Sequence, residues 1–130
     1  MMPTRLTVHN MLQVLLIKPY QKEVKPYLAA IPLGLLCLAS ALQERFDDVQ
    51  VDLLDMNAHG LEPHWLKENL QHYQPHVIGV SALNCQAIAA RQIATICKEL
   101  NPDILTVLGG PYANHRSSEI LKQSDFDWVF

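Results

Sequence analysis

Short apolar runs alternate with longer amphipathic stretches along the chain, with a repeat of about 25 to 30 residues. The apolar runs are rich in β-branched residues and show little internal alternation, which is typical of parallel strands covered on both faces. The strands that this pattern predicts cover residues 13–18, 49–54, 77–81, 104–108 and 128–130.

Between these runs, apolar residues recur at the three- and four-residue spacing of helices that face a core. Helices are expected from about Pro32 to Arg45, after Pro63, from about Ala89 to Leu100, and around Ile120. The alternation of strands and helices predicts right-handed βαβ crossovers and therefore an α/β domain with a doubly wound parallel sheet. We expect one domain over residues 12–130, preceded by an N-terminal extension over residues 1–11.

The loops that follow the strands are the first place to look for a site. In an open α/β sheet, ligands bind in the crevice beyond the carboxyl ends of the strands. The loops expected there cover residues 19–33, 55–62, 81–86 and 109–115.

Two of these loops begin with small residues. Gly109 and Gly110 follow the fourth strand, where bare backbone lets a ligand approach closely; a tight turn from strand to loop is an equal alternative. Ser81 ends the third strand and offers a hydroxyl to a ligand, and Asn84 is assigned as the cap of a helix that opens at Cys85.

The histidines and cysteines do not form a metal pattern. Residues 55–60 contain His59 in an Asp-Met-Asn-Ala-His-Gly run, which is interpreted as a solvated loop. The six histidines lack metal-ligand spacing on one helical face, and His115 ends the expected ligand loop over residues 109–115. Three widely spaced cysteines (Cys37, Cys85 and Cys97) form neither a disulfide framework nor a zinc motif and suit a reducing compartment.

Composition and charge exclude several classes of protein. Among the 130 residues, 18% are charged and the net charge is −3, so no basic surface for nucleic acid is expected. The longest apolar stretch, residues 31–42, is too short to cross a bilayer, which takes about 20 residues, and no membrane partner is expected. The first residues do not read as a signal peptide, and we expect a cytoplasmic protein.

Several enzyme motifs are also missing. The sequence has no Gly-x-x-x-x-Gly-Lys-Ser/Thr loop, no Gly-x-Gly-x-x-Gly after the first strand and no Gly-x-Ser-x-Gly elbow. A phospho-receiver domain shares the expected architecture but needs acidic residues at the carboxyl edge. Here the first strand ends in Lys18 and the third in Ser81, so charge excludes that class.

Taken in order, several segments resemble a known family. They are residues 15–19 (LLIKP), 32–35 (PLGL), 38–42 (LASAL), 51–55 (VDLLD), 75–81 (PHVIGVS), 107–113 (VLGGPYA) and 126–130 (FDWVF). In order and spacing they are similar to the N-terminal cobalamin-binding domain of cobalamin-dependent radical S-adenosylmethionine enzymes. This group includes the anaerobic cyclases that act on Mg-protoporphyrin monomethyl ester.

The resemblance implies a flavodoxin-like, Rossmann-like fold with five parallel strands in the order 2-1-3-4-5. It implies that the corrin ring lies across the carboxyl ends of the strands and that the dimethylbenzimidazole tail enters the crevice there. Carried onto this sequence, the cofactor-binding residues are Pro19, Tyr20, Leu33, Gly34, Ser81, Ala82, Leu83, Gly109, Gly110, Pro111 and Tyr112.

Two departures from related domains limit what the resemblance implies. The first loop reads Tyr20 to Glu23 and lacks the Asp-x-His-x-x-Gly of methionine-synthase-type domains, so cobalamin is expected base-off without a histidine ligand from that loop. The chain also lacks the Cys-x-x-x-Cys-x-x-Cys loop that holds a four-iron cluster. The cluster, S-adenosylmethionine and a C-terminal radical domain are therefore expected after Phe130, in a parent enzyme of methyltransferase or cyclase type.

Two alternatives remain. One is a structural or interaction domain that keeps the fold but no longer binds cobalamin; the missing histidine motif favours it, and the small residues at the strand ends oppose it. The other is a domain for a different flat cofactor such as flavin mononucleotide. A flavin phosphate needs a loop rich in Ser and Thr after the first strand, and residues 19–25 provide none.

Overall fold

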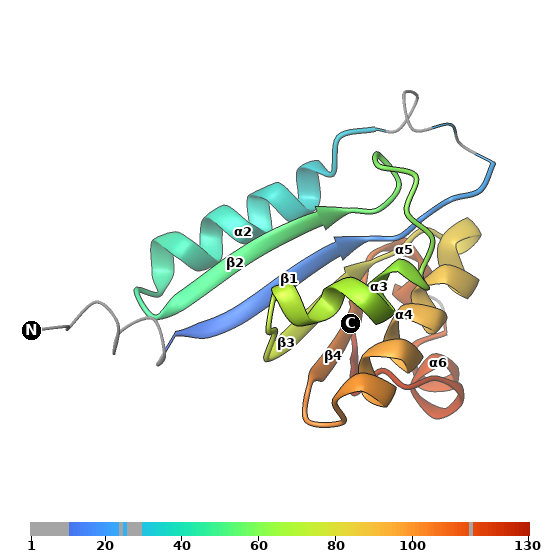
Figure 1. Cartoon of the computed structure of the whole chain (residues 1–130). Helices are drawn as coiled ribbons and strands as arrows, with labels where there is room; N and C mark the ends of the chain where they lie inside the picture. The colour runs from blue at the N-terminus through green and yellow to red at the C-terminus, as the bar shows by residue number, and fades with distance from the viewer. Residues whose placement is uncertain (1–10, 24, 26–29, 115) are drawn as a thin grey trace, which may run out of the picture.

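A five-stranded parallel sheet forms the centre of the computed structural model, which describes residues 11–23, 25, 30–114 and 116–130 (Figure 1). The strand order is β2-β1-β3-β4-β5, and every neighbouring pair is parallel. The strands are β1 (Leu12–Lys18), β2 (Val49–Asp55), β3 (Val77–Ser81), β4 (Leu105–Gly109) and β5 (Trp128–Val129). The flavodoxin-like fold and its strand order are thereby confirmed. The expected extension over residues 1–11 lies, except for Met11, outside the described residues.

The helices fall close to the expected segments. They are α2 (Leu33–Arg45), α3 (Trp65–Asn69), the 3₁₀ turns η2 (Leu70–His72) and η3 (Asn84–Gln86), α4 (Ala87–Leu100), α5 (Pro111–Asn114) and α6 (Ser117–Gln123). The short helix α5 has no counterpart in the sequence prediction, because a single turn offers too few residues to show a period. No helix in the described part of the chain is long and apolar enough to span a membrane.

The two faces of the sheet are covered unequally. On one face α3, α4 and α6 bury the larger core, which includes Ile17, Ile78 and Leu108. On the other face α2 lies alone over β1 and β2, where Leu35 packs with Val14, Leu16 and Val51. Figure 1 shows α2 running beside β2, away from the helices of the opposite face.

This asymmetry corrects one sequence expectation. Strand β1 has a continuous buried run over residues 14–17, as a strand covered on both faces should. In β3 and β4, buried residues alternate with partly exposed ones instead. The expectation of two covered faces is therefore wrong for β3 and β4, because α2 does not reach over them.

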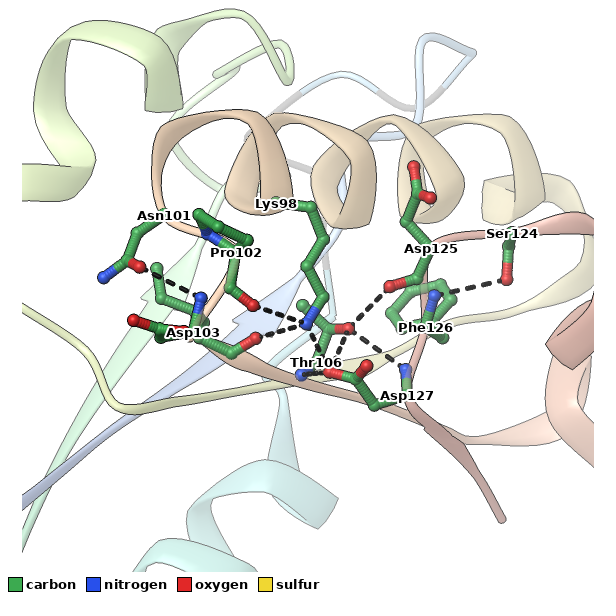
Figure 2. Close-up of polar contacts among 10 residues, drawn as sticks. Lys98, Asn101, Pro102, Asp103, Thr106, Ser124, Asp125, Phe126 and Asp127 are labelled. Atoms are coloured by element: carbon green, nitrogen blue, oxygen red, sulfur yellow. Dashed lines mark hydrogen bonds and ion pairs between the residues drawn. The ribbon is translucent and has the colours of Figure 1, made fainter.

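A polar cluster holds the edge strand β5 in place (Figure 2). The Lys98 ammonium on α4 donates to Asp127 Oδ2 at 2.6 Å and to the carbonyl of Ile104 at 2.6 Å. Asp127 also accepts the Thr106 N–H at 2.9 Å, and the Thr106 hydroxyl donates to the Asp125 carbonyl at 2.7 Å. These bonds join α4, β4 and β5, so a strand of two residues is fixed by side chains as well as by its ladder.

Candidate functional site

The loop after β1 is clamped to the loop after β3 by one buried side chain. Gln86 Nε2 donates to the carbonyl of Pro19 at 3.0 Å, while Gln86 Oε1 accepts the N–H of Leu83 at 2.9 Å. The side chain of Gln86 therefore caps the start of η3. The prediction that Asn84 is the cap is wrong, because Asn84 lies inside η3. A glutamine three residues after the start of a helix was the signal that could have found it.

We expect Gln86→Leu to lower the free energy of unfolding by about 2 kcal/mol, because it leaves the buried carbonyl of Pro19 and the part-buried N–H of Leu83 without their partner. Urea unfolding followed by circular dichroism measures this. Gln92→Leu, an exposed change on the following helix α4, is the control and should stay within about 0.5 kcal/mol of the unmodified protein. An equal loss in both variants would contradict a specific clamp.

The loop after β2 is an ordered turn that supports the first loop. Asn57 is buried and its Oδ1 accepts the N–H of Gln21 at 3.1 Å. Asp55 Oδ1 accepts the N–H of Ala58 at 2.9 Å, and Gly60 closes the turn with φ of 64°. The expected solvated loop is confirmed only for His59 and Gly60, which are exposed.

On the side where a side chain would stand, Gly110 faces the backbone of Ala82 and not open space. Its φ is +88°, and a Cβ built there would lie 2.9 Å from both the N and the O of Ala82. The same turn is closed by hydrogen bonds from Ala82 N–H to the Gly109 carbonyl and from Tyr112 N–H to the Ala82 carbonyl. Of the two interpretations open from the sequence, the tight turn is therefore the one that the structure shows at Gly110.

Other expected site residues are also engaged within the fold. Pro19 and Ala82 are buried, and the Tyr112 hydroxyl accepts a hydrogen bond from Arg91 Nε at 2.8 Å. Pro111 opens α5 and is exposed. These four residues shape the carboxyl edge, and Pro111 alone among them is exposed.

The remaining site residues leave open space at the carboxyl edge. A Cβ added at Gly34 or at Gly109 would meet no atom within 4 Å. Gly109 is the register partner of Ser81, so these two residues lie side by side on the sheet face that α2 shares. The open residues of the edge are Gly34, Ser81, Gly109, the exposed Leu33 and Leu83, and the half-buried Tyr20.

Lys18 ties the segment before α2 to the end of β1. It ends β1, and its ammonium donates to the carbonyl of Ala30, three residues before α2 begins. Leu33 and Gly34 start the helix. The start of α2 therefore lies near the carboxyl end of β1, at the same edge of the sheet where Ser81 and Gly109 end β3 and β4.

A separate groove of about 800 Å³ lies between α3 and α4. Among the expected site residues, only Tyr20 lines it. Its charged lining mixes both signs, with Lys22, Lys67 and Arg91 against Glu23, Glu62 and Glu99. The groove belongs to the sheet face opposite α2, so it is distinct from the open edge.

Comparison with known proteins decides the family. The B12 binding domain model matches residues 24–130, which is most of the chain and includes the ends of β3 and β4 but not the end of β1, Pro19 or Tyr20. The chain belongs to the B12 binding domain family.

Two curated relatives agree with this B12 binding domain assignment. The chain is 28% identical over 101 residues to an uncharacterized methyltransferase from Pyrococcus horikoshii, covering 76% of the chain and 21% of the relative. It is 30% identical over 79 residues to the anaerobic magnesium-protoporphyrin IX monomethyl ester cyclase of Rubrivivax gelatinosus, covering 61% of the chain and 14% of that enzyme. The resemblance stated from the sequence is confirmed, and the chain spans about a fifth or less of these relatives.

Solved structures agree with the fold of the B12 binding domain. RcsB from Salmonella enterica serovar Typhimurium, bound to promoter rprA in the presence of phosphomimetic BeF3−, superposes with a TM-score of 0.59 at 14% identity, over 93% of this chain and 59% of RcsB. A second RcsB structure, bound to promoter P1flhDC, gives a TM-score of 0.54 at 16% identity, over 92% and 51% of the two chains. At this identity the likeness shows the fold alone.

Within the described part of the B12 binding domain, no three His, Cys, Asp or Glu side chains come together as a metal site. His76 Nδ1 accepts the N–H of Gln13 at 2.9 Å, and His64 lies 3.5 Å from Glu62 at the surface. His9 and His115 lie outside the described residues. Burial raises the pKa of the Cys97 thiol to about 12, so this cysteine is unreactive, and Cys37 and Cys85 are exposed free thiols.

Proposed function

We propose that this domain binds cobalamin at the carboxyl edge of its sheet. The observation that carries the proposal is the family match over residues 24–130 together with the open Ser81–Gly109 pair that those residues form. Cobalamin is a large cofactor with a flat ring and a nucleotide tail, and it needs an edge where backbone is accessible. Gly34 and Gly109 provide that access, because a Cβ at either position would occupy open space.

The proposed contacts divide between the ring and the tail. Tyr20 and the exposed Leu83 lie on the loops after β1 and β3, where they would support the ring. Ser81 and Gly109 would line the tail, with Leu33 and Gly34 at the start of α2 opposite them. Pro19, Ala82, Gly110, Pro111 and Tyr112 would act by shaping the loops that carry these residues.

The first loop supplies no histidine, since its sequence is Tyr-Gln-Lys-Glu over residues 20–23. We therefore propose that cobalamin is held base-off, without a histidine from this loop on cobalt. The bound cofactor would supply a cobalt centre for methyl transfer or radical chemistry. The relatives are about five to seven times longer than the stretch matched here, which supports a longer parent protein. We propose that its catalytic radical S-adenosylmethionine domain follows residue 130.

The alternative is a domain that keeps this fold for structural or interaction purposes only. The observation in its favour is that Pro19, Ala82, Gly110 and Tyr112 are already engaged with the domain's own atoms. The open space at Gly34 and Gly109 favours the cofactor instead, because a purely structural domain has no need of it.

Binding is tested with hydroxocobalamin and the purified domain. After gel filtration, we expect corrin absorbance to remain with the protein, with band positions of the base-off form. Gly109→Leu should weaken retention by about tenfold without changing the circular dichroism spectrum, because its side chain enters the open region. Ile88→Ser, which changes an exposed side chain in the α3–α4 groove, is the control and should bind normally.

Two outcomes would count against these proposals. A folded domain that retains no corrin would favour the structural alternative. Unchanged retention by Gly109→Leu would leave cobalamin binding in place but would remove the Ser81–Gly109 pair as its location.

A further inference from the structure

Two buried amide side chains hold the loop after β1 in place. Among the residues that the structure describes, the buried polar side chains are Asn57, Gln86 and Thr106, with exposed fractions of 3%, 2% and 0%. Thr106 belongs to the cluster that fixes β5, whereas Asn57 and Gln86 bond to backbone groups of loops at the carboxyl edge. A buried polar side chain destabilises a fold unless it is hydrogen-bonded, so these loop contacts offset the cost of burying the two amides.

The hydrogen bonds of the two amides lie on either side of Tyr20. Gln86 Nε2 donates to the carbonyl of Pro19 at 3.0 Å, directly before Tyr20. Asn57 Oδ1 accepts the N–H of Gln21 at 3.1 Å, directly after it. The backbone of Tyr20 is therefore fixed from both sides, by side chains from the loops after β2 and β3.

Gln86 also fixes the second residue that is proposed to support the ring. Its Oε1 accepts the N–H of Leu83 at 2.9 Å, so one carboxamide uses its donor for the loop after β1 and its acceptor for the loop after β3. Leu83 is exposed and Tyr20 is half-buried, so both side chains present surface at the edge. The same buried side chain therefore sets the positions of these two loops relative to each other.

We infer that Asn57 and Gln86 are positioning residues, which hold Tyr20 and Leu83 in place for the corrin ring before the cofactor binds. This inference rests on the proposed function and adds to it two residues that are themselves buried. Ordering a loop at the moment of binding weakens affinity, because the loop loses conformational freedom. A loop that buried amides already hold in one conformation avoids this loss, as a binding site on a rigid support does.

Amide hydrogen exchange in the cofactor-free domain tests whether the loops are preformed. We expect the N–H groups of Gln21 and Leu83 to exchange more slowly than in an unstructured peptide, by about tenfold or more. Asn57→Leu should remove the protection at Gln21, and Gln86→Leu should remove it at Leu83. Nuclear magnetic resonance follows both amides separately. Exchange of both amides at the rate of an unstructured peptide in the unmodified domain would overturn the inference.

Affinity for hydroxocobalamin tests whether the preformed loops matter for binding. Asn57→Leu and Gln86→Leu should each raise the Kd about tenfold. Thr106→Val is the matched control, because it removes the third buried polar side chain, in the cluster that fixes β5. It should lower the urea midpoint but change the Kd by less than about twofold. An equal rise of the Kd in all three variants would trace the effect to lower stability alone and would overturn the inference.

Rescue and coupling at Asn57 distinguish positioning from a purely structural role. Asn57→Asp keeps an oxygen that accepts the Gln21 N–H, so it should recover most of the affinity that Asn57→Leu loses, even though its buried carboxylate lowers the urea midpoint. Tyr20→Ala combined with Asn57→Leu should bind hydroxocobalamin no more weakly than Tyr20→Ala alone, because Asn57 acts through Tyr20. Additive losses of affinity in the double variant would overturn this role for Asn57.

The binding results also separate this inference from the proposed function. If the unmodified domain retained no corrin, the binding site and the residues that position it would both be overturned. If corrin were retained and the Kd were unchanged in Asn57→Leu and Gln86→Leu, cobalamin binding would stand and only the positioning role would be overturned.

Discussion

Replacing Gly110 by alanine is expected to lower the free energy of unfolding by about 3 kcal/mol. Two destabilising effects add at this position, one from the backbone conformation and one from steric overlap. The φ of +88° lies in a region that residues with a Cβ rarely adopt. The new methyl carbon would also lie 2.9 Å from two backbone atoms of Ala82, which cannot move aside as the end of a flexible side chain can.

The neighbouring glycine is the matched control for this prediction. A Cβ at Gly109 meets nothing within 4 Å, so Gly109→Ala should change the free energy of unfolding by less than about 0.5 kcal/mol. Urea unfolding of both variants, followed by circular dichroism at pH 7, gives the comparison. If Gly110→Ala were as stable as Gly109→Ala, the turn at residues 109–112 would not have the conformation described.

The contrast between the two glycines explains why the site could be predicted only in part. The sequence shows two adjacent glycines after a strand, and both interpretations, turn and ligand access, fit that dipeptide. The structure distinguishes the two glycines, because Gly110 faces the backbone of Ala82 while Gly109 faces open space. This difference depends on where the loop after β3 lies, and residues 109–110 alone carry no signal for it.

The fold was more accessible to prediction than the contacts that position its loops. Each of the strand predictions overlaps the observed strand, because the apolar runs of β1 to β4 are a local signal. Gln86 and Pro19 are 67 residues apart, and Lys98 and Asp127 are 29 apart. A single sequence gives no signal for such pairs, so the clamp and the β5 cluster were missed.

The sequence did not predict that the α2-side face of β3 and β4 is uncovered, and the reason is different. Val77, Gly79 and Ser81 face the α2 side of β3, and Leu105, Val107 and Gly109 face it in β4. Such residues are compatible with a covered or an open face, so periodicity could not distinguish the two. At the carboxyl end of this face lie Ser81 and Gly109.

The cluster around Asp127 is expected to make the free energy of unfolding fall at low pH. Partial burial raises the pKa of the Asp127 carboxyl, but the hydrogen bonds from Lys98 and Thr106 and the charge of Lys98 outweigh it, so the pKa lies below its ordinary value of 3.8. A carboxylate whose pKa is lower in the folded state stabilises that state above its unfolded pKa. This stabilisation is lost as the pH falls through the folded pKa.

We expect Asp127→Asn to lower the free energy of unfolding by about 2 kcal/mol at pH 7, a value kept small because the pair is partly exposed to solvent. The difference between Asp127→Asn and the unmodified protein should be constant from pH 7 to about pH 5. It should shrink below about pH 4, where the Asp127 carboxyl of the unfolded chain begins to take up a proton while that of the folded chain is still ionised. Urea unfolding across this pH range measures the difference directly.

Two further variants separate the cluster from general charge effects. Asp103→Asn removes an exposed carboxylate of the loop before β4 and should change the free energy of unfolding at pH 7 by less than about 0.5 kcal/mol. Lys98→Met removes the donor to Asp127 and to the carbonyls of Pro102 and Ile104, and the double variant Lys98→Met with Asp127→Asn should lose less than the sum of the single losses. Additive losses would show that the two side chains act independently. In that case the cluster drawn in Figure 2 would not be what fixes β5 at the edge of the sheet.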